Sequence, residues 1–183
     1  TRWSINSSGN LAATGAYGID FGQATPSAGG GSGTTGSASN SVLSDYEFGS
    51  WVPRFEMTGA NFASSTMTVL AAQYVKVGRV VHVQAFIRTN GLDVTGATGT
   101  VAVQGLPFVA EATTNNFAPM TVGYSALWTQ APEAGYVHTN AAYIRLMRRS
   151  TTGTSTITAS DMTAGGTANN NELIIGGSYV ATT

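Results

Sequence analysis

The chain has 183 residues, enough for one domain with a sizeable core, but only 9% are charged, against about 25% in ordinary globular chains. With a net charge of −1 it has no basic patch for nucleic acid or an anionic membrane. The absence of cysteine excludes disulfides, thiolate zinc sites and thiol catalysis, and no run reaches the ~18 apolar residues of a membrane span.

The first part of the chain divides into a short β segment and a linker. Residues 2–6 and 16–21 are predicted strands around a turn at Ser8-Gly9, and this segment of residues 1–23 is too small to bury a core alone. We expect it to pack against copies of itself. Residues 24–41 form a Gly/Ser-rich linker or loop. Because the sequence starts Thr1-Arg2-Trp3 without Met, we expect a fragment of a longer protein.

Residues 42–183 are predicted to form the main domain, and one hairpin in it has a derivable register. Gly78-Arg79 suits a two-residue turn, which places Val77 opposite Val80 and continues the pairing to Leu70 opposite Ile87. One face is then apolar and fit for a core, with Leu70, Ala72, Tyr74, Val81, Val83, Ala85 and Ile87. The other face is mixed in polarity, as in a subunit interface, for which the candidates are Val69, Val75, His82, Gln84 and Phe86.

The later strands are separated by turn signals. Asn90-Gly91 predicts a tight turn. Phe108 is expected to pack over one end of the core. Further strands are predicted at residues 100–104, 119–127, 141–148, 155–159 and 173–180. The last should lie inside the sheet, with Leu173, Ile175 and Tyr179 on one face. The total of about eight or nine strands predicts an all-β fold, a jelly-roll-like antiparallel β-sandwich.

Four segments of this domain resemble the C-terminal region of bacteriophage tail fibres and tailspikes. They read LSDYEFGSWVP at 43–53, QYVKVGRVVHV at 73–83, GLPF at 105–108 and ELIIGGSY at 172–179, and WSINSSGNL at 3–11 adds a further similarity. The resemblance implies a jelly-roll-like tip domain that assembles as a homotrimer below a fibre shaft. It also implies an extracellular place on the virion and attachment to host cell-surface polysaccharide or lipopolysaccharide.

The residues themselves give little sign of catalysis or metal binding. Glycan cleavage needs two carboxylates roughly 5–10 Å apart. Glu111 and Glu133 flank one loop region and could meet, whereas Asp45 and Glu47 are expected to fix the entry into the domain. His82 and the second histidine have no metal-binding spacing, and no nucleophile-elbow motif occurs. We therefore expect no enzyme activity, no cofactor and no metal.

The best candidate for ligand binding is the segment 124–138, which joins two predicted strands. Carbohydrate recognition needs a flat aromatic ring for the apolar sugar face and polar groups for the hydroxyls. The candidate residues are Trp128, Gln130, Glu133, Tyr136 and His138. In the alternative interpretation, Trp128 caps the core and Tyr136 begins the next strand. Trp3 and Trp51 are expected to have packing roles.

Three functions follow from this sequence, in order of preference. The first is a receptor-binding tip domain that attaches a phage to host glycan. The second is a purely structural module that trimerises the fibre. The third is a glycan depolymerase. Arg145, Arg148 and Arg149, the one cluster of cations, are expected to form rim or subunit salt links.

Overall fold

The computed structural model describes residues 46–166 and 169–182, and before them only the backbone of four short strands. Strand β1 (Trp3–Ile5) pairs with β2 (Leu11–Ala13), and β3 (Ile19–Asp20) pairs with β4 (Val42–Leu43). Strands β1 and β3 fall within the predicted ranges 2–6 and 16–21, and β2 lies between these ranges. The linker at 24–41, the turn at Ser8-Gly9 and the side chain of Trp3 lie outside the described residues.

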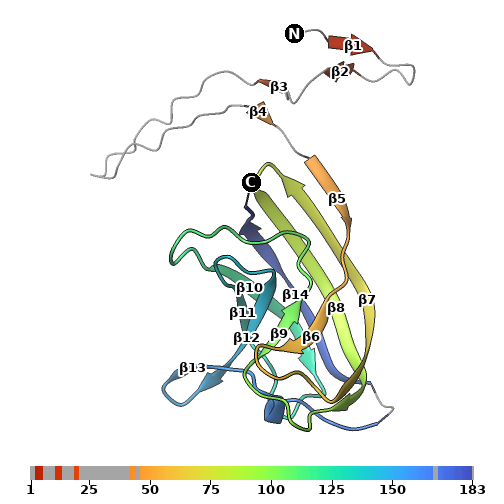
Figure 1. The fold of residues 1–183 in the computed structure, drawn as a ribbon, viewed down its shortest axis with the longest axis vertical. Helices are drawn as coiled ribbons and strands as arrows, with labels where there is room; N and C mark the ends of the chain where they lie inside the picture. Colours follow the sequence, from red (N-terminus) through yellow and green to blue (C-terminus); the bar gives the residue numbers. More distant parts are fainter. Residues whose placement is uncertain are drawn as a thin grey trace.

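The main domain is a single antiparallel sheet that curls around its core, so the predicted all-β class is confirmed (Figure 1). Its strand order is β5-β7-β8-β14-β10-β11-β12-β9-β6, with β13 paired to β12. The strands are β5 (Tyr46–Ser50), β6 (Arg54–Met57), β7 (Ser64–Val77), β8 (Val80–Asp93), β9 (Val101–Gln104), β10 (Ala118–Ala126), β11 (Ala134–Val137), β12 (Tyr143–Ser150), β13 (Gly153–Thr156) and β14 (Asn170–Val180); a 3₁₀ turn, η1, covers Ala159–Asp161.

The predicted hairpin register is confirmed over the half nearest the turn. Gly78 has a φ of 56°, the left-handed conformation that glycine adopts without steric cost. Val77 lies opposite Val80, and the pairing continues in the predicted register as far as Ala71 opposite Phe86. A register shift between Val69 and Ala71 then leaves Leu70 in a bulge and exposed. The prediction that Leu70 belongs to the core is therefore wrong.

Asn90-Gly91 is not a turn but part of strand β8, which continues to Asp93. The ladder pairs Thr89 with Met67 and Gly91 with Thr66, so Asn90 is the extra residue of a second bulge. Its side-chain amide donates to the Thr68 hydroxyl at 2.7 Å. A Cβ at Gly91 would lie 2.8 Å from the carbonyl oxygen of Gly166, so the close approach of another chain segment explains this glycine.

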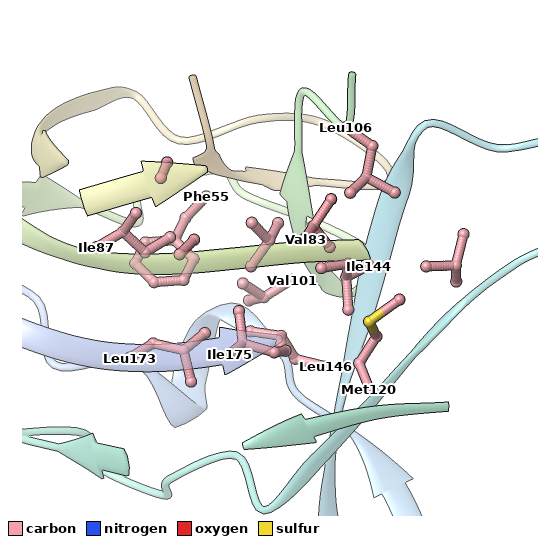
Figure 2. Packing of buried hydrophobic residues seen from close by; sticks show 14 of the residues in the cluster. Phe55, Val83, Ile87, Val101, Leu106, Met120, Ile144, Leu146, Leu173 and Ile175 are labelled. Carbon is pink, nitrogen blue, oxygen red and sulfur yellow. The ribbon is translucent and has the colours of Figure 1, made fainter. Parts of the chain in front are cut away.

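The core lies between the long strands β8 and β14 and the shorter strands β6, β9 and β12 (Figure 1). The predicted inner faces are confirmed, because Val81, Val83, Ala85, Ile87, Leu173, Ile175 and Tyr179 are all buried. Trp51 is buried as predicted, and its indole N–H donates to the Gln84 carbonyl at 3.2 Å. Figure 2 shows Phe55, Val101, Ile144 and Leu146 packed among Val83, Ile87, Leu173 and Ile175.

The two edge strands of the curled sheet, β5 and β6, are consecutive in the chain. Only residues 51–53 join them, although they stand at opposite ends of the strand order. The Phe55 N–H of β6 donates to the Met67 sulfur of β7 at 3.1 Å, so the edges of the sheet approach each other there. This arrangement lets one sheet enclose the core.

Candidate functional site

Trp128 is half-buried and packs on the core. Its ring meets the Phe55 ring edge-on, with 5.4 Å between centroids, and its indole N–H donates to the Glu172 carbonyl at 2.9 Å. The ring contact and the hydrogen bond together hold the indole against the core, as in a buried structural tryptophan. The geometry favours the alternative interpretation of Trp128, as a residue that caps the core.

Gln130 and Glu133 have exposed side chains on a connection fixed by backbone hydrogen bonds. The Gln130 N–H donates to the Asp161 carbonyl, and the Glu133 N–H donates to the Met147 carbonyl, each at 2.9 Å. Glu133 lines a surface cleft of about 550 Å³ beside the β12–β13 hairpin. The segment predicted as one loop contains strand β11, so it presents its residues in a strand geometry.

Tyr136 and His138 are brought together on the outer side of β11. Alternation places Val137 in the core and turns the residues on either side of it away from the core. Phe117 joins them, with its ring centroid 5.6 Å from that of Tyr136 and 4.9 Å from that of His138. Phe117 is 45% exposed, whereas Tyr136 and His138 are half-buried, so this aromatic group is partly open to solvent.

Arg145 of β12 supports this group from the next strand. It is the direct cross-strand partner of Tyr136, and its guanidinium donates to the Tyr136 hydroxyl at 3.1 Å and to the Tyr143 hydroxyl at 3.5 Å. The guanidinium carbon lies 5.7 Å from the centre of the Tyr136 ring. Burial lowers the pKa of Arg145, but the interactions with the two tyrosines outweigh it and leave the pKa raised, so the side chain stays charged.

We call this group the aromatic–arginine strip, defined as Phe117, Tyr136, His138, Tyr143 and Arg145. The next outward pair along the same strands is Ala134 with Met147, and both residues line the cleft that contains Glu133. Arg149, two residues further along β12, lines the cleft as well. Because outward positions repeat every second residue, the strip and the cleft form one continuous surface along β11 and β12.

Four of the five predicted interface residues occupy a second surface, on the outer side of β7 and β8. The prediction for Val69 is wrong, because beyond the bulge at Leu70 it pairs with the buried Ile87 and so lies on the opposite side of the sheet. Val75 lies opposite His82, and the His82 ring is hydrogen-bonded to the Ser178 hydroxyl at 3.1 Å. Phe86 stacks edge-on against Tyr124 with 6.4 Å between centroids. We call this surface the outer face. It comprises Tyr46, Phe48, Val75, Val77, Val80, His82, Gln84, Phe86 and Tyr124, of which all but the half-buried Phe86 are exposed.

Glu111, one of the two carboxylates considered for glycan cleavage, has a cationic partner within the chain. Glu111 forms an ion pair with Arg79 at 2.7 Å, and hydrogen bonds from Arg79, Thr113 and Asn116 hold the pKa of Glu111 below its ordinary value. Within residues 46–166 and 169–182, no hydrogen bond or ion pair joins Glu111 to Glu133. No group of three His, Cys, Asp or Glu side chains in this part of the chain could hold a metal ion. No described helix is long and apolar enough to cross a membrane.

The sequence did not predict the roles of Phe117, Tyr143 and Arg145. Arg145 was expected at a rim or in a subunit salt link together with Arg148. The structure instead pairs Arg148 with the buried Asp161 at 3.2 Å inside the chain. The available signal was the alternation of β12, which places Tyr143 and Arg145 on the side opposite to the buried Ile144 and Leu146.

Comparison with known protein families, curated proteins and solved structures found no match for this chain.

Proposed function

We propose that this protein is the receptor-binding tip domain of a phage tail fibre or tailspike, and that it attaches the virion to a host cell-surface glycan. The observation that supports the proposal most directly is the aromatic–arginine strip. It combines the exposed Phe117 ring and half-buried tyrosine rings with hydroxyl, imidazole and guanidinium groups on a pair of hydrogen-bonded strands. Such a combination suits a sugar, because rings contact the apolar sugar face and polar groups contact the hydroxyls.

The proposal includes a homotrimer with a jelly-roll-like tip, joined to a fibre shaft outside the cell. The outer face supports it, because Phe48 alone is 71% exposed and the face continues over the sheet to Val80 and Tyr124. Exposed apolar patches on the order of several hundred Å² mark interaction surfaces. Three copies of a weak site would bind a cell surface far more tightly than one copy.

The experiment is adsorption of the purified protein to host cells and to their isolated polysaccharide. We expect Tyr136→Ala to reduce binding at least tenfold without loss of folding, because the ring and its hydroxyl are both removed from the strip. Val52→Ala is the control, since Val52 is exposed but belongs to neither surface. Equal binding by both variants and the unmodified protein would contradict the proposed site, and absence of binding to any host glycan would contradict the function.

A purely structural module that trimerises the fibre is the second candidate, because the outer face supports it without any need for the strip. The two functions differ in one measurement. A structural module forms the trimer in sedimentation experiments but does not retain host polysaccharide on a glycan array.

A further inference from the structure

We infer that the ligand of the aromatic–arginine strip is an acidic glycan, one whose sugar units carry carboxylate or phosphate groups. The inference rests on the proposed function and adds the chemical class of the ligand. It follows from the direction of the hydrogen bonds within the strip and from the cations along β12.

The two tyrosine hydroxyls of the strip are fixed as donors toward a ligand. A hydroxyl has one proton to donate and can also accept. The hydroxyls of Tyr136 and Tyr143 each accept a hydrogen bond from Arg145, which has no lone pair to offer in return. Each tyrosine proton is therefore directed away from Arg145. Among the described residues, neither hydroxyl donates to a protein acceptor, so both protons are available to a ligand.

Arg145 adds a positive charge that no carboxylate balances within residues 46–166 and 169–182. The ion pairs of this part of the chain join Arg54 to Glu56, Arg79 to Glu111, Arg88 to Glu172 and Arg148 to Asp161. Arg145 is half-buried; its Nε–H is buried without an acceptor, so a ligand would contact the terminal nitrogens of the guanidinium. A partly desolvated guanidinium held by neutral hydroxyls alone is well placed to bind an anion, because charge-assisted hydrogen bonds are the stronger kind.

Arg149 extends this positive surface along the strand. It lies four residues from Arg145, which corresponds to about 13 Å along a β-strand. It is exposed at the cleft and has no ion pair within the described part of the chain. Glu133 lines the same cleft but forms no ion pair with Arg149. Two cations at this spacing, with Met147 between them and Tyr136 opposite Arg145, suit an extended chain that carries repeated negative charges.

The test compares charged and neutral forms of one polymer. Binding of the whole protein is measured to polygalacturonate, to its fully methyl-esterified form and to a glycerol-phosphate polymer, at low and high salt. We expect binding to at least one charged polymer, a loss of roughly tenfold or more with Arg145→Gln, a smaller loss with Arg149→Gln, and weakening by salt. The two charged polymers distinguish carboxylate from phosphate.

Arg54→Gln is the matched control. Arg54 is a cation with an exposed side chain on β6, but Glu56 already pairs with it, so its removal should change binding less than twofold. Thermal unfolding of each variant identifies any that fails to fold. If Arg145→Gln does not fold, binding by Arg149→Gln, a substitution at an exposed residue, still tests the inference. Equal binding to the esterified and free polymers would overturn the inference but leave the proposed function intact. Absence of binding to every polymer and to host glycan would overturn both.

Discussion

The hydroxyl of Tyr179 donates a hydrogen bond to the carbonyl oxygen of Phe108 at 2.9 Å and accepts one from the N–H of the same residue at 3.2 Å. Tyr179 lies near the end of β14 and is only 2% exposed. The Phe108 ring in turn packs edge-on against Tyr74 and lies 5.1 Å from the ammonium nitrogen of Lys76, which is itself buried. One side chain thus fixes the loop that closes this end of the core.

Tyr179→Phe should destabilise the protein by about 1–3 kcal/mol, because it leaves a half-buried N–H and C=O without their partner.

Burial raises the pKa of Tyr179 to about 12, from an ordinary value of 10.0. A raised pKa in an acid means that the folded state favours the protonated form. The contribution of this pKa shift to the free energy of unfolding is therefore complete below pH 10. It is lost as the pH rises from 10 toward 12, and the loss is roughly 2 kcal/mol.

Urea unfolding of this variant at pH 8 and at pH 11.5 checks the prediction. The unmodified protein should lose more stability between the two values than the variant does. Tyr46→Phe, which changes an exposed tyrosine, should behave like the unmodified protein. An identical loss in Tyr179→Phe would show that Tyr179 is not the group responsible.

Asn171→Asp should lower the free energy of unfolding by about 2–4 kcal/mol at neutral pH. The buried Asn171 amide donates to the Thr89 hydroxyl at 2.8 Å and to the Thr163 carbonyl at 2.9 Å, while its oxygen accepts the Thr163 N–H. A carboxylate cannot donate and would face the carbonyl oxygen without compensation. Denaturant unfolding should show partial recovery at pH 4, where the new carboxyl gains a proton.

The control for this variant is Asn115→Asp. Asn115 also has a positive φ, 63° against 50° for Asn171, but its side chain is exposed. It should change the free energy of unfolding by less than about 0.5 kcal/mol. Equal effects at the two positions would mean that the buried amide network contributes nothing.

Gly105→Ala should be far more damaging than Gly96→Ala. Both glycines have positive φ, 90° and 72°, so each substitution carries a conformational cost of about 1 kcal/mol. At Gly105 the added Cβ would also lie 2.5 Å from the Val52 carbonyl oxygen, whereas nothing lies within 4 Å at Gly96. Thermal melting should show a clear difference, and similar melting temperatures would contradict the close approach of the two segments.

Trp128→Ala should lower stability by about 2–3 kcal/mol while the folded fraction keeps its affinity for host glycan. The reason is that this ring packs on Phe55 and does not belong to the strip. Circular dichroism melts and binding at a temperature where the variant is folded check both parts. A stable variant that no longer binds would restore Trp128 as the sugar platform.

Phe48→Ser should weaken self-association without reducing the stability of the isolated chain. Phe48 is 71% exposed on the outer face, so its removal takes apolar area from the proposed interface but none from the core. Val52→Ser, at a residue of equal exposure outside that face, is the control. Sedimentation equilibrium at micromolar concentration checks it. A well-folded monomer in the unmodified protein would contradict the trimer.

Local patterns predicted the parts of the fold that depend on neighbouring residues. Gly78 predicted the hairpin turn. The alternation of side chains between the two sides of a strand then predicted which residues of β8 and β14 face the core. The same reasoning failed at Leu70 and at Asn90, because a bulge changes the register by one residue and leaves only a faint trace in composition. Asn90-Gly91 has the composition of a turn, yet its glycine is required by a segment more than seventy residues away.

The candidate site was predicted only in part for a related reason. Tyr136 and His138 were found because they lie in one aromatic segment. Arg145 and Phe117 reach them through the pairing of β11 with β12 and β10, which no single stretch of sequence encodes. Trp128 was a candidate for its chemistry, with a core-capping role as the alternative, and its actual surroundings come from Phe55, far earlier in the chain.

Because one stretch, residues 46–57, supplies both edges of the curled sheet, a single fraying event there would bare two rows of unpaired backbone groups at once. Neighbouring molecules could then exchange this stretch, each completing the other's sheet. Trp51, which lies between these two strands in the chain, opposes such exchange, because it is buried in the core and its indole N–H donates to the Gln84 carbonyl.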